Sequence, residues 1–410
     1  METDSSPTAE KKPPKLRWYQ TKHNLTGENV VSIRERQRHA SAPRYCWSSL
    51  SLGRLLAAIV TLMAGSGCER PRTYPIVIIT DPAVSPSADR VAMVVSRGDP
   101  QVFQKMLDEK ISPVERGHAM EQFGATSRSS LCVLSLSDGK LNDIPAECDF
   151  SKVAWSPDGF QIAFTSSRLD STKTDKPSFQ SLGCVNLKTG TVTVPFATPP
   201  CWSPSYSADG KHLAFIQGKD DSLVVVDLST RQRRTLENSV YRHALCWNPK
   251  SLQLFCIGEH GVCQYALSHD KRRVLWSAKG AKQPYPMQLI CSPDGTQLGV
   301  HFQDGRFCTI DLASGILQNR FKCDHYFADF DWNIAGICYL DAVDGDRKDK
   351  AQLRVFDPST GKSSLVVKES ISDPRWLNTS EILVRRGNTE LWRYRISDGQ
   401  GKCVFSGDAQ

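Results

Sequence analysis

Short runs of alternating apolar and polar residues, separated by turn residues, fill most of the chain beyond residue 73. The clearest example is Val153–Arg168, where we expect strands at Val153–Ser156 and Gln161–Ser166 on either side of Pro157-Asp158-Gly159. Proline presets φ for a tight turn, aspartate accepts backbone hydrogen bonds two residues on, and glycine relieves the steric demand. The stretch therefore predicts a β-hairpin, and we call the position of Trp155 the aromatic slot.

The same hairpin recurs along the chain, which matters because an isolated hairpin is only marginally stable in water. Copies of varying quality are found at residues 84–93, 206–215, 247–250, 291–300, 330–339 and 376–379. A third alternating strand ending in a turn follows each hairpin, as in Ile310–Gly315, and a short fourth run closes most units. Four short strands that recur about every 40–50 residues are typical of a β-propeller blade.

The repeat therefore predicts an all-β fold, a single β-propeller over residues 73–408, with seven four-stranded blades and with six or eight as alternatives. A β-sandwich would not repeat one turn at a fixed phase, and a β-solenoid has a shorter period. The strand expected at Thr73–Thr80 could complete the last blade from outside and lock the ring. Against this, Leu391–Ile396 and Lys402–Ser406 already account for that blade's outer strands.

The motif Trp-Ser-Pro-Asp-Gly followed by an apolar strand, and then a strand ending in Asp-Leu-x-x-Gly, resembles the TolB-type propeller repeat. The resemblance covers about Asp81 to Asp408 and is most specific at Val153–Arg168, Tyr206–Phe215 and Cys291–Val300. The Gly-His and Trp-Asp signatures of WD repeats are missing. TolB proteins carry a separate α/β domain before the propeller, for which this chain has no room, so the resemblance implies the fold and not the translocation role.

The N-terminal part differs in composition from the repeats. Residues 1–53 show no sustained periodicity and are expected to be disordered, or not translated if the true start lies further along the chain. Residues 54–68 combine Arg54, the apolar run Leu55–Ala64 and Gly65-Ser66-Gly67-Cys68. Such a run is too short to span a membrane but fits a signal-peptide core, and the small residues before cysteine resemble a bacterial lipoprotein cleavage box.

Cys68 is therefore the candidate lipid anchor, with Gly65 as a departure from the usual residue at its position. This interpretation predicts an extracytoplasmic protein that is lipid-anchored to a bacterial membrane, on the outer-membrane or periplasmic side. A buried helix with an incidental cysteine is the alternative interpretation, and it would fit a cytoplasmic scaffold instead.

Charge and motifs exclude several function classes. Residues 1–68 carry ten Lys/Arg and five Asp/Glu, so that the chain's net charge of +7 leaves only +2 for the propeller, which is no footprint for nucleic acid. Gly-x-Ser-x-Gly, His-Glu-x-x-His and Cys-x-x-Cys motifs are all missing. The acidic stretch Asp341–Asp346 lacks the ligand spacing of an EF-hand and is interpreted as a solvated loop. We therefore predict no catalytic residue, no metal and no cofactor.

The chain's fourteen cysteines are expected mostly to pack as small apolar residues. Cys132, Cys263 and Cys308 occupy one slot of the third strand in three different blades, too far apart to pair. Disulfides remain an alternative for the irregularly placed Cys148, Cys201, Cys323 and Cys403, since the compartment of a lipoprotein can be oxidising.

Long insertions are expected between the second and third strands of three blades, at residues 99–128, 169–178 and 341–350. In a propeller these connections share one face. Val102, Phe103, Met106 and Leu107 predict an amphipathic helix in the first insertion, which either packs on its own blade or forms a partner-binding cap. We expect a non-enzymatic membrane-anchored module that binds a protein or glycan at this face. The alternative is a propeller enzyme of lyase or hydrolase type, with its site in the central channel or on the top face.

Overall fold

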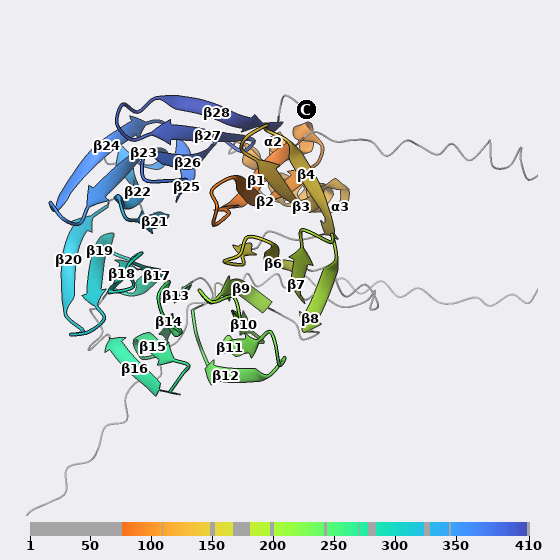
Figure 1. Cartoon of the computed structure of the whole chain (residues 1–410). Coiled ribbons are helices and arrows are strands. Elements are labelled where there is room, and N and C mark those ends of the chain that lie inside the picture. Colours follow the sequence, from red (N-terminus) through yellow and green to blue (C-terminus); the bar gives the residue numbers. More distant parts are fainter. Residues whose placement is uncertain are drawn as a thin grey trace, which may run out of the picture. The chain divides into compact units, whose positions relative to one another are not determined.

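The computed structural model describes residues 76–407, except 109, 148–151, 167–180, 197–200, 242–243, 270, 278–283, 324–328 and 344–345. Seven four-stranded antiparallel sheets form a β-propeller, and their inner strands surround the centre of the ring (Figure 1). The predicted fold class is thus confirmed, with seven blades. The predicted lead at residues 1–53 and the signal segment with Cys68 lie outside the described residues.

Each blade is one continuous stretch of chain whose strands run from the inside of the ring to the outside. The inner strands are β1 (Ile76–Val84), β5 (Ala154–Trp155), β9 (Cys201–Tyr206), β13 (Leu245–Trp247), β17 (Pro286–Cys291), β21 (Phe330–Asn333) and β25 (Ile371–Trp376). The second strands are β2 (Arg90–Arg97), β6 (Gln161–Ser166), β10 (His212–Gln217), β14 (Gln253–Gly258), β18 (Gln297–Phe302), β22 (Gly336–Val343) and β26 (Glu381–Arg386). The third strands are β3 (Arg128–Ser135), β7 (Ser181–Asn186), β11 (Ser222–Asp227), β15 (Gly261–Ala266), β19 (Arg306–Asp311), β23 (Asp346–Asp357) and β27 (Glu390–Arg395). The outer strands are β4 (Leu141–Glu147), β8 (Val192–Phe196), β12 (Arg233–Glu237), β16 (Lys271–Trp276), β20 (Leu317–Lys322), β24 (Lys362–Lys368) and β28 (Gly401–Ser406).

The turn between the first two strands of a blade is held by its own side chains. In blade 2, the Ser156 hydroxyl donates to the Asp158 carboxylate (2.5 Å), which also accepts from the amide of Phe160 (3.0 Å). Gly159 has a φ of +70°, where other residues are strained. Blades 3 and 5 repeat the Ser–Asp bond at Ser207–Asp209 and Ser292–Asp294. This local chemistry explains why the motif could be read without any tertiary information.

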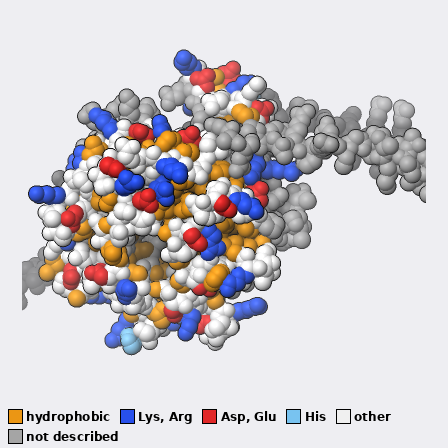
Figure 2. Space-filling model, turned by 45° about the horizontal axis from the view of Figure 1, so that its top comes forward, with side chains coloured by type: hydrophobic (Ala, Val, Ile, Leu, Met, Phe, Trp, Pro, Cys, Tyr) orange, Lys and Arg blue, Asp and Glu red, His pale blue; other side chains and the backbone are white. Residues whose placement is uncertain are grey.

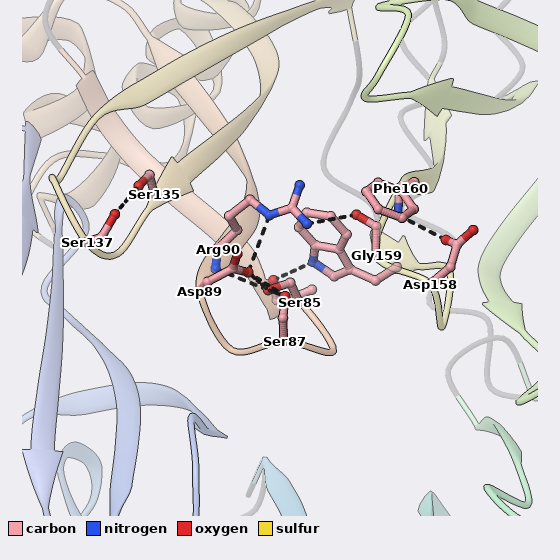
Figure 3. A network of polar contacts seen from close by, with 11 residues as sticks. Ser85, Ser87, Asp89, Arg90, Ser135, Ser137, Asp158, Gly159 and Phe160 are labelled. Atoms are coloured by element: carbon pink, nitrogen blue, oxygen red, sulfur yellow. Dashed lines mark hydrogen bonds and ion pairs between the residues drawn. The ribbon is translucent and has the colours of Figure 1, made fainter.

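Polar contacts also join neighbouring blades on the face that carries these turns, which we call the turn face. Trp155 Nε1 donates to the carbonyl oxygen of Ala83 in blade 1 (2.8 Å). In the other direction, Arg90 of blade 1 lies over the Trp155 ring and donates to the carbonyl oxygen of Gly159 (2.9 Å; Figure 3). Trp155 is consequently half-buried rather than fully buried. Trp247 makes the equivalent bond to Ser205 (3.0 Å), so the contact belongs to the repeat.

Apolar clusters fill the spaces between blades. One cluster joins Ala92 and Val94 of blade 1 to Ile162, Phe164 and Val185 of blade 2. Because each sheet buries both of its faces against neighbours, a single blade has no core of its own.

The ring closes without any exchange of strands between its ends. The segment that could have completed the last blade instead begins the inner strand β1, which pairs with β2 of blade 1. Blade 7 ends with its own outer strand, β28. The junction of blades 7 and 1 is made by the backbone bond from Ile79 N to Asn388 O (2.7 Å) and by a shared apolar cluster. That cluster contains Ile79, Met93, Leu383, Leu391 and Phe405. Side-chain packing therefore closes the ring.

Antiparallel pairing places the start of each inner strand beside the end of the second strand, as in Ile76 opposite Arg97. All connections between second and third strands therefore emerge where the inner strands begin, and we call this the insertion face. The first insertion contains the predicted helix, α2 (Pro100–Leu107), and a second helix, α3 (Pro113–Thr126). The second predicted insertion, 169–178, lies outside the described residues.

The third insertion was predicted as a solvated loop, and that interpretation is wrong. Residues 341–343 continue β22 and residues 346–350 belong to β23, so the two strands extend as a hairpin. The Asp341 carboxylate lies 3.4 Å from Arg354 Nε across these strands. Continued strand pairing gives this polar sequence a regular backbone.

Candidate functional site at the ring axis

The inner strands of all seven blades can be aligned on the aromatic slot, because the slot residue pairs with the first turn of the second strand in every blade. The pairs are Val84–Val91, Trp155–Ile162, Tyr206–Leu213, Trp247–Leu254, Cys291–Leu298, Trp332–Ile337 and Trp376–Ile382. We call the residue three places before the slot the axial position. In blade order it is Asp81, Lys152, Ser203, Ala244, Gln288, Asp329 and Asp373. Charged residues thus occupy the axial position in four consecutive blades, 6, 7, 1 and 2.

The charged axial residues interact with one another across the ring. Asp81 and Asp373 repel each other, Lys152 attracts both Asp81 and Asp329, and Arg375 of β25 acts on all of them. Residues of four different blades can meet in this way only near the axis. We define Asp81, Lys152, Asp329, Asp373 and Arg375 as the axial cluster.

Two of these aspartates owe their position to bulges in the inner strands. Asp81 (φ 49°) and Asp373 (φ 54°) both have left-handed backbone conformations, and each precedes a proline. The pairing register shifts at the same places, between Thr80 and Ala83 and between Ser372 and Arg375. A bulge accommodates proline, which cannot donate to the ladder, and re-aims the neighbouring side chain.

Asp329 and Asp373 form a hydrogen-bonded pair of carboxyl groups whose environments differ. Burial, together with the neighbouring Asp373, raises the pKa of Asp329. For Asp373 burial acts in the same direction, but the Arg385 guanidinium outweighs it and lowers the pKa. Arg385 Nε donates to Asp373 at 2.7 Å, and the Ser372 hydroxyl donates to the same oxygen at 2.9 Å. Asp373 is therefore the carboxylate of the pair and Asp329 the group that holds a proton.

Burial also dominates at the other axial charges. It raises the pKa of Asp81, with Asp373 adding to the effect, and it lowers the pKa of Lys152, with Arg375 adding to the effect. Lys152 is exposed to solvent and Asp81 is half-exposed, so both are reachable from the axis although protein surrounds them. Perturbed titratable groups that gather in one solvent-accessible place are typical of binding and catalytic sites.

Beneath the pair, Asp331 fixes the blade 6–blade 7 junction. Its two carboxylate oxygens accept from the amides of Trp376 (2.8 Å) and Trp332 (2.9 Å). Arg375, which lies between this carboxylate and the pair above, donates to the carbonyl oxygen of Pro374 (2.8 Å). These contacts hold the Arg375 side chain in place below the carboxyl pair.

The helical insertion lies on the insertion face and packs on its own blade. Phe103 of α2 and Phe123 of α3 contact each other (ring centroids 5.6 Å apart), and both belong to a cluster with Ile78 of β1. Ser112 and Glu115 form a capping box at the start of α3. The outer side of the hairpin remains exposed, including Val114, which is 67% exposed.

The other candidate chemistry gives no further site in the described residues. All eleven cysteines that the structure describes are free thiols, including Cys201, Cys323 and Cys403, whereas Cys148 lies outside them. Burial raises the pKa of Cys132 to about 12, which suits packing and not nucleophilic chemistry. Within the same residues, no His, Cys, Asp or Glu group of three or more is placed to hold a metal ion, and no helix has the length and apolar character needed to cross a bilayer.

Basic and acidic side chains are interspersed on the face shown in Figure 2. This agrees with the small net charge expected for the propeller.

The sequence interpretation did not single out any residue of the axial cluster. It aligned the repeats from the aromatic slot onward, whereas the charged positions lie three residues before it. Comparison of the same position in all seven repeats would have shown the division into charged and neutral blades. What it could not show is that these blades bring their charges together at the axis.

No family model and no curated protein matches the sequence. Many solved structures resemble the fold. The tricorn protease matches with a TM-score of 0.56 and 13% identity, over 81% of this chain and 34% of its own. The β-propeller domain of the Trilobed protease from Pyrococcus furiosus, described as having an open velcro topology, matches with a TM-score of 0.54 and 12% identity, over 81% of this chain and 99% of its own.

An acylaminoacyl peptidase, solved in complex with a chloromethyl ketone, matches with a TM-score of 0.54 and 12% identity, over 82% of this chain and 53% of its own. The matched parts are therefore about a third of the tricorn protease chain and half of the peptidase chain. At such identities the likeness shows the propeller fold.

Proposed function

We propose that this protein is a non-enzymatic propeller of TolB type, lipid-anchored outside the cytoplasm, that binds a protein or glycan partner at the insertion face with the axial cluster as the centre of the site. One observation carries the proposal. Charged axial residues occur in blades 6, 7, 1 and 2, and blades 6 and 1 also carry the described insertions. Two independent features thus mark the same half of the ring.

The fold itself does not require these charges. Blades 3, 4 and 5 have Ser203, Ala244 and Gln288 at the same position and make the same four strands. Desolvation of charged groups is costly, and replacement of buried ion pairs by apolar residues is often neutral or stabilising. Residues that break a repeat's rule at a cost to stability indicate a functional site.

The experiment replaces residues 99–127 by a short Gly-Ser turn. We expect an intact fold, because the apolar contacts of α2 and α3 are mostly with each other, and we expect weaker capture of the partner from membrane extracts. Ile334→Ser, a change on the turn face at a residue that is 81% exposed, is the matched control and should capture normally. If the shortened protein folds and captures as before, recognition does not use this insertion.

The anchor is tested separately. Cys68→Ser should block processing, leave a longer precursor and release the protein from the membrane fraction. The intact mass of the native protein decides the matter, since a chain that retains residues before Cys68 and carries no lipid would rule out the anchor.

The Asp329–Asp373 pair supports a second candidate, an acid–base enzyme. Two hydrogen-bonded carboxyl groups whose pKa values are shifted in opposite directions can act as acid and base. Mass spectrometry of captured partners distinguishes the two functions. A binding module returns its partner unchanged, whereas an enzyme returns a product with wild-type protein and intact partner with Asp329→Asn.

A further inference from the structure

The charges at the axis do not balance without a proton. Counting the neighbours that contact the axial cluster, the site holds four carboxyl groups and three cations. The carboxyl groups are Asp81, Asp329, Asp331 and Asp373, and the cations are Lys152, Arg375 and Arg385. The proton shared by Asp329 and Asp373 supplies the fourth positive charge.

Two of the four carboxyl groups have strong partners within the fold. Asp373 accepts from Arg385 and Ser372, and Asp331 accepts from two backbone amides, as described above. Their charges are thus compensated by groups that do not depend on a ligand.

The other two carboxyl groups, Asp81 and Asp329, lack such partners. Among the described residues, Asp81 has no hydrogen bond or ion pair, and Asp329 has only its bond to Asp373 and a long contact from Gln288 Nε2 (3.5 Å). Next to Asp81, the Thr80 hydroxyl oxygen is also buried without a partner in the described part of the chain. Hydrogen-bond acceptors of two neighbouring elements are therefore left for a donor that the fold does not supply.

We propose that the axial cluster receives a primary ammonium group of the ligand, which replaces the proton shared by Asp329 and Asp373. This inference rests on the proposed binding function and names the ligand class. One ammonium enters, one proton leaves to solvent, and the charge of the site is unchanged. A peptide carries such a group at its N-terminus and on lysine side chains, whereas a neutral glycan has none.

An ammonium suits the site better than other cations. It has three donors, and three consecutive blades present the carboxyl groups of Asp329, Asp373 and Asp81. A metal ion needs several ligands on one side of it, and no such group exists among the described residues. The exchange also depends on the charges that face Asp329 from each side. These are Asp373 and Arg375 of β25, Asp81 of β1, Lys152 ahead of β5 and Asp331 on its own strand.

Titration calorimetry of the processed protein tests the exchange with three probes. Triglycine amide offers an α-ammonium, N-acetyl-lysine amide offers a side-chain ammonium, and N-acetyl-triglycine amide offers neither. At least one of the first two should bind and the third should not, and the one that binds identifies the source of the ammonium. Repetition in buffers of different ionisation enthalpy should show proton release at about pH 5 that fades towards pH 8, with affinity rising over that range.

Asp329→Asn should weaken binding by about tenfold or more, because a hydrogen bond to a charged acceptor is lost. Asp81→Asn provides a second variant in case the first does not fold, as checked by circular dichroism. Asp304→Asn is the matched control, since Asp304 lies in a strand 2–strand 3 connection of blade 5 and pairs with Arg306 (2.7 Å).

Equal binding of the acetylated probe, an undiminished affinity in both variants, displacement of the probe by Ca²⁺, or binding without proton release would each overturn the inference. Loss of binding by none of the probes at millimolar concentration, because none binds, would overturn it as well. The proposed function fails differently, namely when partner capture is unaffected by removal of the insertion. Capture that needs the insertion but ignores the amines would keep the function and reject the ammonium.

Discussion

At the scale of single residues, the contacts between blades depend on a few large side chains and a few small ones. Trp155 joins blades 1 and 2 through its ring, its indole N–H and the overlying Arg90. The third residue of the hairpin's second strand is small in most blades, as at Ala163, Ala214 and Gly299. Both kinds of position are set by what the neighbouring chain leaves free.

Trp155→Ala should lower the free energy of unfolding by about 3 kcal/mol, because a large aromatic contact and a hydrogen bond are lost. Ile334→Ala removes an apolar side chain that is 81% exposed, from the equivalent turn of blade 6, and should change stability by less than about 0.5 kcal/mol. Urea melts measure both. Similar losses for the two variants would contradict the assigned interface.

Glycine substitutions should have opposite effects at two sites. A Cβ at Gly299 would lie 2.5 Å from Phe307 Cζ and 2.9 Å from Ile290 Cγ2, so Gly299→Ala should destabilise by about 1–3 kcal/mol. At Gly117 in α3 nothing lies within 4 Å, and Gly117→Ala should stabilise the helix by about 0.5–1 kcal/mol. Thermal melts of the two variants should shift in opposite directions.

At the scale of elements, the turns of the blades depend on ionised aspartates. Hydrogen bonds from Ser87 lower the pKa of Asp89 to about 2, and those from Ser229 do the same for Asp227. A carboxyl group whose pKa is lower in the folded state contributes stability above its unfolded pKa, near 4, and loses it as the pH falls through its folded pKa. The axial Asp329 and Asp81, with raised pKa values, have the opposite sign and disfavour the folded state as they ionise.

The turns should therefore weaken between about pH 4 and pH 2, which denaturant melts across that range would show. Asp89→Asn keeps the acceptor oxygen but removes the charge, so its stability should fall less over the same interval. Asp329→Asn should leave the acid loss unchanged and should lessen the decline of stability on the alkaline side of about pH 4. An acid loss that is the same in Asp89→Asn and wild type would show that this turn carries none of it.

At the scale of the whole molecule, the ring is closed by side chains alone. The junction of blades 7 and 1 is an apolar cluster like those between other blades, with no strand shared between them. Each blade is therefore an interchangeable unit in the order of the chain, and the ring has no unique starting point.

A circular permutant tests this equivalence. Joining Ser406 to Ile76 by a linker of about seven residues, and opening the chain between β16 and β17, should give a folded propeller with a melting temperature within about 5 °C of wild type. Circular dichroism and thermal melts measure it. Failure to fold would show that the junction of blades 7 and 1 depends on more than its side chains.

The sequence by itself determined the blade, because everything that defines the hairpin is local. The Ser–Asp bond, the left-handed Gly159 and the alternation of Gln161–Ser166 all act within a few residues, so the repeat and the number of blades could be read directly. The helix at Val102–Leu107 followed from its periodicity for the same reason.

Only the tertiary structure decided how the ring closes and what its axis contains. Asp81, Asp329 and Asp373 are far apart in the chain, and each is unremarkable within its own blade. They interact because the blades meet at one axis, where burial and neighbouring charges alter their titration. The extended hairpin of blade 6 has the same origin, since its polar residues form strands only by pairing with each other across β22 and β23.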